Sequence, residues 1–230
     1  MARRRVSNLL ALAVLSCLSE KPMHPYEIST TLRSRGKELS IKLNYGALYA
    51  VVESLTKHGL IEPQETVREG RRPERTVYRI TQAGRDEHDD WLAELLSTPV
   101  REYTSLEAGL SLVGGLGPDE VARLLEGRVL KLRVELAGVE SELAAAHEMG
   151  VPELFTVEGD FRVAMLQAEQ QYVAALAERI RSGSLAGAAF WRRLHELREE
   201  GVSSAEVLAD PERWLGKEAA ESFPMLRSGR

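Results

Sequence analysis

The stretch that decides the fold is residues 42–81, KLNYGALYAVVESLTKHGLIEPQETVREGRRPERTVYRIT. Its first part has apolar residues at helical spacing, which predicts a short amphipathic helix. These residues are Leu48, Val51 or Val52, and Leu55. Asn44 is placed to cap that helix, and Gly59 to end it in the left-handed conformation. Two runs rich in β-branched and aromatic residues follow, residues 60–67 and 76–80, and they predict a pair of strands.

The turn between the two predicted strands is rich in arginine. It reads EGRRPER, and the arginines in or beside it are Arg68, Arg71, Arg72 and Arg75. A helix followed by an arginine-tipped hairpin is the outline of a winged helix-turn-helix, an arrangement that reads DNA. The alternative is a small α/β element whose exposed turn happens to be basic, because short motifs also match by chance.

The distribution of charge favours the nucleic-acid interpretation, although the whole chain is acidic. Its 230 residues carry a net charge of −5. Residues 1–81 hold fourteen Lys or Arg against eight Asp or Glu, a net charge of +6. Residues 82–230 hold sixteen against twenty-seven, a net charge of −11. A basic first third joined to an acidic remainder is the asymmetry expected of a DNA-binding head on a body that does not touch DNA.

Length and composition predict a cytoplasmic protein of one large or two modest domains. No run approaches the roughly eighteen apolar residues of a membrane span. The apolar run at residues 9–18 follows MARRR as in a signal peptide, but it has no small-residue cleavage site and continues into patterned helix. The single cysteine, Cys17, excludes an internal disulfide and fits a reducing compartment, and its apolar surroundings predict a buried thiol.

Two helices are predicted ahead of this stretch. The first is strongly apolar, begins after Ser7 as its cap, and ends before a proline-containing break. The second has Pro25 at its first position and is stopped by Gly36. Residues 39–41 are expected to form a short extended or turn segment. The resulting order of helix, helix, helix, strand, basic turn and strand is that of the winged helix-turn-helix.

Three segments together resemble the PadR family of bacterial transcriptional regulators, over roughly residues 7–97. They are NLLALAVLSCLSEKPMHPYEIS, GALYAVVESLTKHGLIEP and GRRPERTVYRITQAGRDEHDDWL. The most specific parts are HPYEI at the start of the second helix, GALYAVVESL in the third, and RITQAG after the wing. Two positions depart from the family pattern. Pro25 stands where glycine is common, and Ala47 stands where many relatives have a hydroxyl residue that could hydrogen-bond to a base.

The resemblance implies a dimeric DNA-binding regulator, by default a repressor, with the third helix in the major groove of a roughly palindromic operator. We expect the start of that helix to lie nearest the bases, although Asn44, as a cap, has already used its side-chain oxygen. The tyrosines, Lys42 and the wing arginines are expected to hold phosphates, which sets affinity and register but not sequence. The expected DNA contacts are Tyr26, Lys42, Asn44, Tyr45, Gly46, Tyr49, Arg71, Arg72 and Arg75.

The rest of the chain is predicted to be helical. Thr81 is predicted to cap a helix over residues 82–96. The apolar side of this helix consists of Trp91, Leu92, Leu95 and Leu96. After a start signal at residues 117–120, apolar residues recur at spacings of four and three, a heptad seam over three repeats. The seam residues are Leu125, Val129, Leu132, Leu136, Val139, Leu143 and Ala146. Residues 161–181 form a second such helix, and the short linker between the two predicts an antiparallel pair.

The sequence therefore predicts a mainly α (α+β) fold in three parts. These are a winged-helix DNA-binding domain (1–97, with a two-stranded wing), an all-helical dimerisation domain (98–183) and a C-terminal helical extension (184–230). The resemblance implies that the long helices embrace a second subunit. The alternative is an intramolecular hairpin with no partner. Dimerisation is favoured because a lone two-helix hairpin leaves one side of its apolar surface uncovered.

Some PadR-like proteins use aromatic residues at the dimer interface to hold planar effectors. The resemblance therefore suggests a site for a small aromatic effector in the second half of the chain. The candidate residues are Trp91, Phe161, Tyr172 and Trp191. Packing in the core is the alternative for each of them, because aromatic side chains dominate protein cores.

No pattern for a catalytic, cofactor or metal site is found. The acidic cluster at residues 86–90 is spread over different faces of a helix, so we interpret it as a solvated surface and not as a metal site. The chain has no glycine-rich phosphate loop, no zinc-type Cys/His spacing and no Gly-x-Ser-x-Gly motif, so no enzymatic activity is expected. The alternative function is a winged-helix module that binds other proteins without binding DNA.

Overall fold

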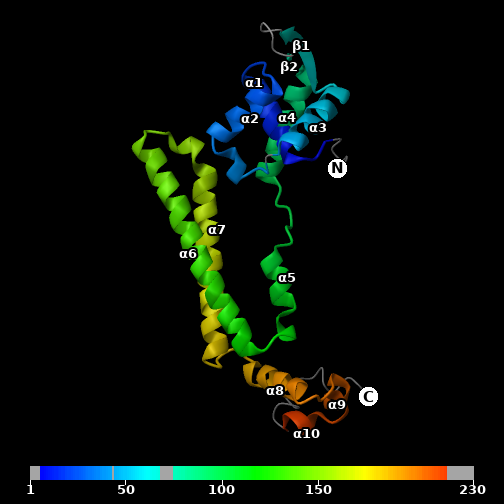
Figure 1. The fold of residues 1–230 in the computed structure, drawn as a ribbon, viewed down its shortest axis with the longest axis vertical. Helices are drawn as coiled ribbons and strands as arrows, with labels where there is room; N and C mark the ends of the chain where they lie inside the picture. The colour runs from blue at the N-terminus through cyan, green and yellow to red at the C-terminus, as the bar shows by residue number, and fades with distance from the viewer. Residues whose placement is uncertain (1–5, 43, 68–74, 217–230) are drawn as a thin grey trace. The chain divides into compact units, whose positions relative to one another are not determined.

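The computed structural model describes residues 6–42, 44–67 and 75–216. The chain divides into two compact units, Met1–Glu102 and Tyr103–Arg230. The first contains α1 (Leu9–Glu20), α2 (Pro25–Ser34), the 3₁₀ helix η1 (Lys37–Leu39), α3 (Tyr45–Lys57), β1 (Ile61–Val67), β2 (Arg75–Ile80) and α4 (Gln82–Ser97). The second contains α5 (Ser105–Ser111), η2 (Val113–Gly115), α6 (Pro118–Glu148), η3 (Glu153–Phe155), α7 (Val157–Arg181), α8 (Ala188–Glu199), α9 (Ser204–Ala209) and α10 (Pro211–Leu215). The mainly helical fold with a two-stranded wing confirms the predicted fold class (Figure 1). The predicted three-part division stays a prediction; α8–α10 belong to the second compact unit.

Helix α1 is the centre of the first unit. Most of its residues are buried, as expected of a helix that is apolar on all sides. The predicted cap was wrong by one position: Asn8, not Ser7, caps α1, and its side chain accepts a hydrogen bond from the backbone N–H of Leu10 at 2.9 Å. Cys17 is buried in this helix, and burial raises the pKa of its thiol to about 11.

Helix α2 begins and ends as predicted. Pro25 is its first residue, and His24 and Glu27 form a reciprocal capping box at its start. Gly36 adopts φ 66° after its last turn, a conformation that favours glycine. The 3₁₀ helix η1 follows and ends at Leu39, and Ser40 and Ile41 then form the turn expected at residues 39–41.

The sheet is an antiparallel hairpin in which Ile61 pairs with Ile80 and Val67 with Arg75, with an irregularity between Pro63 and Glu65. An isolated bridge joins Met23 to Tyr78 at N···O distances of 3.0 Å in both directions. The turn between α1 and α2 is therefore tied to the wing. This bridge holds the hairpin against the helical core.

The passage from the wing into α4 depends on Gly84. Thr81 caps α4 through a hydrogen bond from the Gly84 N–H to its hydroxyl oxygen at 3.1 Å, as predicted. A Cβ atom at position 84 would lie 2.0 Å from the carbonyl oxygen of Leu60. No real Cβ approaches that closely, so only glycine lets α4 pack here.

The two long helices of the second unit form a hairpin. The predicted heptad residues of α6 are buried or half-buried, and Val173 and Ile180 of α7 are buried. Ion pairs across the hairpin confirm its antiparallel direction, because one residue number falls as the other rises. They are Glu126–Arg181 (2.6 Å), Arg128–Glu169 (2.6 Å) and Glu135–Arg162 (2.7 Å). The heptad seam of α6 therefore packs against α7 of the same chain.

Helix α8 packs against the start of α6. The indole N–H of Trp191 donates to the carbonyl oxygen of Leu116 at 2.9 Å, and Arg192 pairs with Asp119 at 3.1 Å. The ring of His195 lies over Gly117, where a Cβ would come within 3.0 Å of it. These contacts fix the bend between η2 and α6. Across the described ranges, none of the helices combines the length and the apolar character needed to cross a membrane.

Candidate nucleic-acid interface

Helix α3 has one buried face and one polar, exposed face. Its apolar stripe of Leu48, Val51, Val52 and Leu55 lies in the core of the first unit. Tyr49 lies on the other face and is 51% exposed, and Glu53 beside it is also exposed. The stripe therefore anchors α3 and leaves its outer face available to a ligand outside the protein.

The N-terminal turn of α3 is open. Asn44 has extended backbone dihedrals, φ −139° and ψ 131°, and its side-chain oxygen accepts a hydrogen bond from the Gly46 N–H at 2.9 Å. This confirms the predicted cap. A Cβ at Gly46 would stand 3.5 Å from that oxygen, an ordinary contact. Folding therefore does not require glycine at position 46, and its predicted role in close approach to DNA stays a prediction.

Two further predicted contacts lie on the surface of the same unit. Tyr26, in the first turn of α2, is 54% exposed, and Lys42 is exposed just ahead of α3. Tyr26 and Tyr49 are therefore not core residues, and their predicted contacts with DNA stay predictions. Among the described residues, Lys42 forms no ion pair, whereas Arg35 is occupied by Glu20. The hydrogen bond from Arg35 lowers the pKa of the Glu20 carboxyl.

The wing is described only in part. Arg79 on β2 is paired with Glu62 on β1 at 2.6 Å, which leaves it neutralised within the hairpin. Arg75 lies at the start of β2, where its backbone pairs with Val67. The side chain of Arg75 and the whole of Arg71 and Arg72 lie outside the described residues, as does the side chain of Tyr45. Their predicted roles at the DNA stay predictions.

The comparisons with known proteins bear on this unit. Residues 14–90 match the transcriptional regulator PadR-like family. These residues are a PadR-like domain. They contain the capping box of α2, the whole of α3 and the RITQAG run in which Gly84 meets Leu60, so the resemblance inferred from those motifs is confirmed. A comparison with curated proteins finds no match.

Solved structures of similar fold include PadR from Bacillus subtilis in complex with operator DNA, with 18% identity and a TM-score of 0.52 over 72% of this chain and 99% of that chain. The same protein in complex with p-coumaric acid has 16% identity and a TM-score of 0.51, over 72% and 99%. The virulence activator AphA of Vibrio cholerae has 19% identity and a TM-score of 0.57, over 75% and 98%. These identities establish the fold alone. In each case the neighbour is matched almost completely, while about a quarter of this chain is left unmatched.

The four aromatic residues predicted to hold an effector are divided between the two units, and their predicted role stays a prediction. Trp91 is buried in the core of the first unit. Phe161 and Tyr172 are exposed on α7 of the second unit, about three helical turns apart. Trp191 packs against the apolar cluster of α6 and α7 and hydrogen-bonds to Leu116. None of the four lines either of the two pockets described in the second unit.

A cavity lies between α5 and α6, lined mostly by leucines and valines, and it was not predicted from the sequence. Two signals were available. Leu106, Leu110 and Val113 recur at helical spacing on a segment too short to form a core of its own. Such a stripe must face another element. Glycine at positions 109 and 127, inside helices, was the second signal, because glycine disfavours helix unless space or close approach is needed.

Proposed function

We propose that this protein is a homodimeric transcriptional regulator that binds a roughly palindromic operator through the N-terminal turn of α3. The observation that carries the proposal is the division of α3: its apolar stripe is buried, and Asn44, Gly46 and Tyr49 face outward. In a helix-turn-helix protein, this end of the helix is the part that enters the major groove.

The contacts divide into those that read bases and those that hold the backbone. Asn44 is engaged as a cap and Ala47 has no hydrogen-bonding group, so the turn at residues 44–47 reads the groove by shape and by the reach of Tyr45. The hydroxyls of Tyr26 and Tyr49, together with Lys42, hold phosphates. Arg71, Arg72 and Arg75 add charge at the wing. Such contacts set register and affinity.

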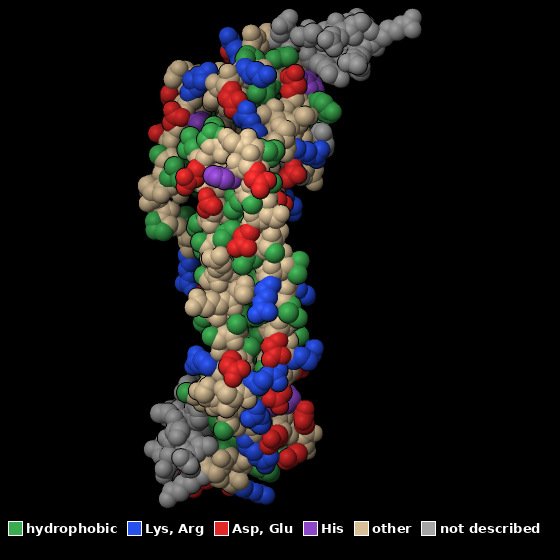
Figure 2. Space-filling view, turned by 90° about the vertical axis from the view of Figure 1, so that its left-hand side faces the viewer, with side chains coloured by type: hydrophobic (Ala, Val, Ile, Leu, Met, Phe, Trp, Pro, Cys, Tyr) green, Lys and Arg blue, Asp and Glu red, His purple; other side chains and the backbone are tan. Residues whose placement is uncertain are grey.

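The dimer is supported by apolar surface that the hairpin does not use. Besides the internal seam, α6 exposes Leu130 at 61% and Val134 at 76%. Helix α7 exposes Phe161 and Met165 in the same way. Figure 2, viewed from the side of the hairpin, shows green hydrophobic side chains at the surface among charged ones along the long helices. Apolar surface of this extent is normally covered, and a second copy of the chain covers it symmetrically.

Two copies bring two recognition helices to one operator, with half-site centres about 34 Å apart or a multiple of that spacing. We assign the protein the role of a repressor that occludes polymerase. Regulation by a small aromatic effector is supported by the similar fold of PadR from Bacillus subtilis, whose structure is described in complex with p-coumaric acid. Such an effector must bind the DNA-competent and DNA-incompetent arrangements with different affinity.

The test is a gel-shift titration with the DNA upstream of the protein's own gene, against a scrambled duplex of equal length. The proposal expects tighter binding to the upstream DNA, weakened by salt and by p-coumarate or a related aromatic acid. Binding to neither duplex at low salt contradicts the proposal. That result favours the second candidate, a winged-helix module that binds protein, for which the exposed stripe on the long helices is the docking surface.

A further inference from the structure

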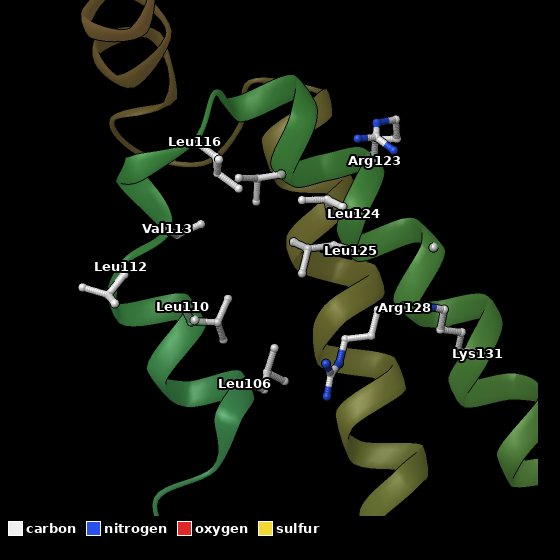
Figure 3. Close-up of a pocket in the computed structure, with 13 residues that line it drawn as sticks. Leu106, Leu110, Leu112, Val113, Leu116, Arg123, Leu124, Leu125, Arg128 and Lys131 are labelled. Atoms are coloured by element: carbon white, nitrogen blue, oxygen red, sulfur yellow. The ribbon is translucent and has the colours of Figure 1, made fainter.

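A cavity of about 540 Å³, open to solvent on one side, lies between α5 and α6 in the second unit. Its size is that of a site for a small organic ligand. Figure 3 shows Leu106, Leu110 and Val113 pointing from one wall toward α6, and Leu125 pointing back toward them. Leu112, in contrast, points away from the space. The cavity lies within one unit and does not depend on how the two units are placed.

The lining of the cavity is apolar on its walls and basic at its edge. Its charged lining residues are Arg123, Arg128 and Lys131, and none of its described lining residues is acidic. Arg128 extends from α6 toward the space beside Leu106 (Figure 3). Its guanidinium forms an ion pair with Glu169 at 2.6 Å. Arg123 has Glu120 at 3.8 Å. Lys131 has no ion pair among the described residues, so the edge carries one uncompensated positive charge.

Two glycines help to keep the cavity open. Gly109 on α5 and Gly127 on α6 both line it, and a Cβ at either position would meet no atom within 4 Å. Glycine inside a helix costs about 1 kcal/mol relative to alanine. At position 127, in the middle of a 31-residue helix, neither packing nor a turn requires it. The missing side chains enlarge the cavity on two of its walls.

We propose that this cavity binds a small amphipathic carboxylate, with its apolar body among the leucines and its carboxylate at Lys131 and Arg128. The walls are built from branched aliphatic side chains, which suit an alkyl or aryl-alkyl body. A single anionic head matches the single uncompensated charge, and Arg128 can orient a carboxylate oxygen through its planar fork. That this ligand is the effector of DNA binding rests on the proposed function.

Trp191 is connected to the lining of the cavity and can report on ligand binding by its fluorescence. Leu116 lines it, and the carbonyl oxygen of Leu116 accepts the hydrogen bond from the Trp191 indole. A ligand that packs against Leu116 therefore changes the surroundings of Trp191 without touching the tryptophan. The same hydrogen bond links α8 to the cavity, so a shift of Leu116 on ligand binding would be passed to α8.

The test is calorimetric titration of the full-length protein, without DNA, with decanoate and with 4-phenylbutanoate, each beside its alcohol. We expect saturable binding of at least one carboxylate with Kd below about 1 mM, accompanied by a change in tryptophan fluorescence that is absent in Trp191→Phe. Gly127→Leu fills the cavity and should weaken binding at least about tenfold. Gly138→Leu is the matched control, because it lies on the same helix, meets no atom within 4 Å and does not line the cavity.

Lys131→Gln tests the charge separately from the shape. It should weaken binding of the carboxylate about tenfold and leave binding of the alcohol unchanged. The proposal is overturned if neither carboxylate saturates, or if Gly127→Leu and Gly138→Leu weaken binding equally. It is also overturned if no carboxylate binds and Gly127→Leu alters the molecular mass in solution. That result would mean that a second copy of the chain covers the cavity. Because no DNA is present, these outcomes do not depend on operator binding.

Discussion

Helix α3 and the α6–α7 hairpin use their apolar residues in opposite ways. The apolar stripe of α3 is buried in the core of its own unit, where Leu55 is fully buried. The other face of α3 is polar and carries the exposed Tyr49. The hairpin buries one seam between its two helices and still exposes Leu130 and Val134 on a second face. What each element leaves uncovered indicates its partner: a polar face with a flat turn suits DNA, and an apolar stripe suits protein.

The largest expected effect comes from comparing the two apolar stripes. The comparison tests whether the stripe of α3 belongs to the core while the exposed stripe of α6 does not. Leu55→Ala should lower the free energy of unfolding by about 3 kcal/mol, because it leaves a cavity in a closed core. Val134→Ala removes a side chain that is 76% exposed and should change the stability of the monomer by less than about 0.5 kcal/mol. Urea denaturation at low protein concentration measures both. Equal losses would mean that the second stripe belongs to the core.

The double variant Leu130→Glu, Val134→Glu places two carboxylates on the exposed stripe of α6. If a second copy covers this stripe, the dimer should dissociate about 100-fold more readily, since a buried unpaired charge is costly. Light scattering coupled to size-exclusion chromatography gives the mass, and operator affinity should fall in parallel. Arg133→Glu, on the same helix and also exposed, is the control and should leave the mass unchanged. Unchanged mass in the double variant removes this stripe from the interface.

The wing is expected to supply charge and little else. Replacing Arg71, Arg72 and Arg75 together with Gln should reduce the slope of log K against log salt by about 3 units, one for each phosphate no longer neutralised. Gel shifts at several salt concentrations give the slope. The relative preference for the operator over scrambled DNA should hold. A slope that stays the same contradicts the assignment of these arginines to phosphates.

The exposed tyrosines should have a smaller effect. Tyr49→Ala and Tyr26→Ala should each weaken operator binding about tenfold, and Tyr49→Phe should show how much of that loss belongs to the hydroxyl. Fluorescence anisotropy with labelled operator measures these affinities. Tyr103→Phe, an exposed tyrosine of the second unit, serves as the control. If Tyr49→Ala binds as well as the unmodified protein, the outer face of α3 does not contact DNA.

The smallest effect concerns the cap. Asn44→Ala should lower the stability of the first unit by about 1 kcal/mol through loss of the hydrogen bond to Gly46, whereas Asn44→Ser should restore most of it. If Asn44 serves only as a cap, Asn44→Ser also restores the sequence preference of DNA binding. A preference that changes in Asn44→Ser at unchanged stability shows that this residue reads a base after all.

The local signals of the first unit were sufficient to predict its fold. Capping and turn residues act over a few positions, so Pro25, Gly36, Asn44 and Thr81 could be interpreted without knowing the rest of the structure. The cap of α1 was misplaced because Ser7 and Asn8 are both good caps, and only geometry chooses between neighbours.

The second unit was harder to predict because a heptad pattern does not say which helix covers it. The linker length predicted that the seam packs within an antiparallel pair, and α7 of the same chain does pack along α6. The surface offered to a partner is a second, less regular stripe. The cavity beside α5 was missed for the same reason: it depends on where one short helix packs, which no periodicity encodes.

Hydroxyl-radical footprinting of the purified protein on its own upstream DNA tests the central claim most directly. The account predicts two protected half-sites whose centres are about 34 Å apart along one face of the duplex. Both should disappear together in the variant Leu130→Glu, Val134→Glu. A single protected site, or two sites that persist in that variant, would contradict the division between a DNA-reading α3 and a dimer-forming hairpin.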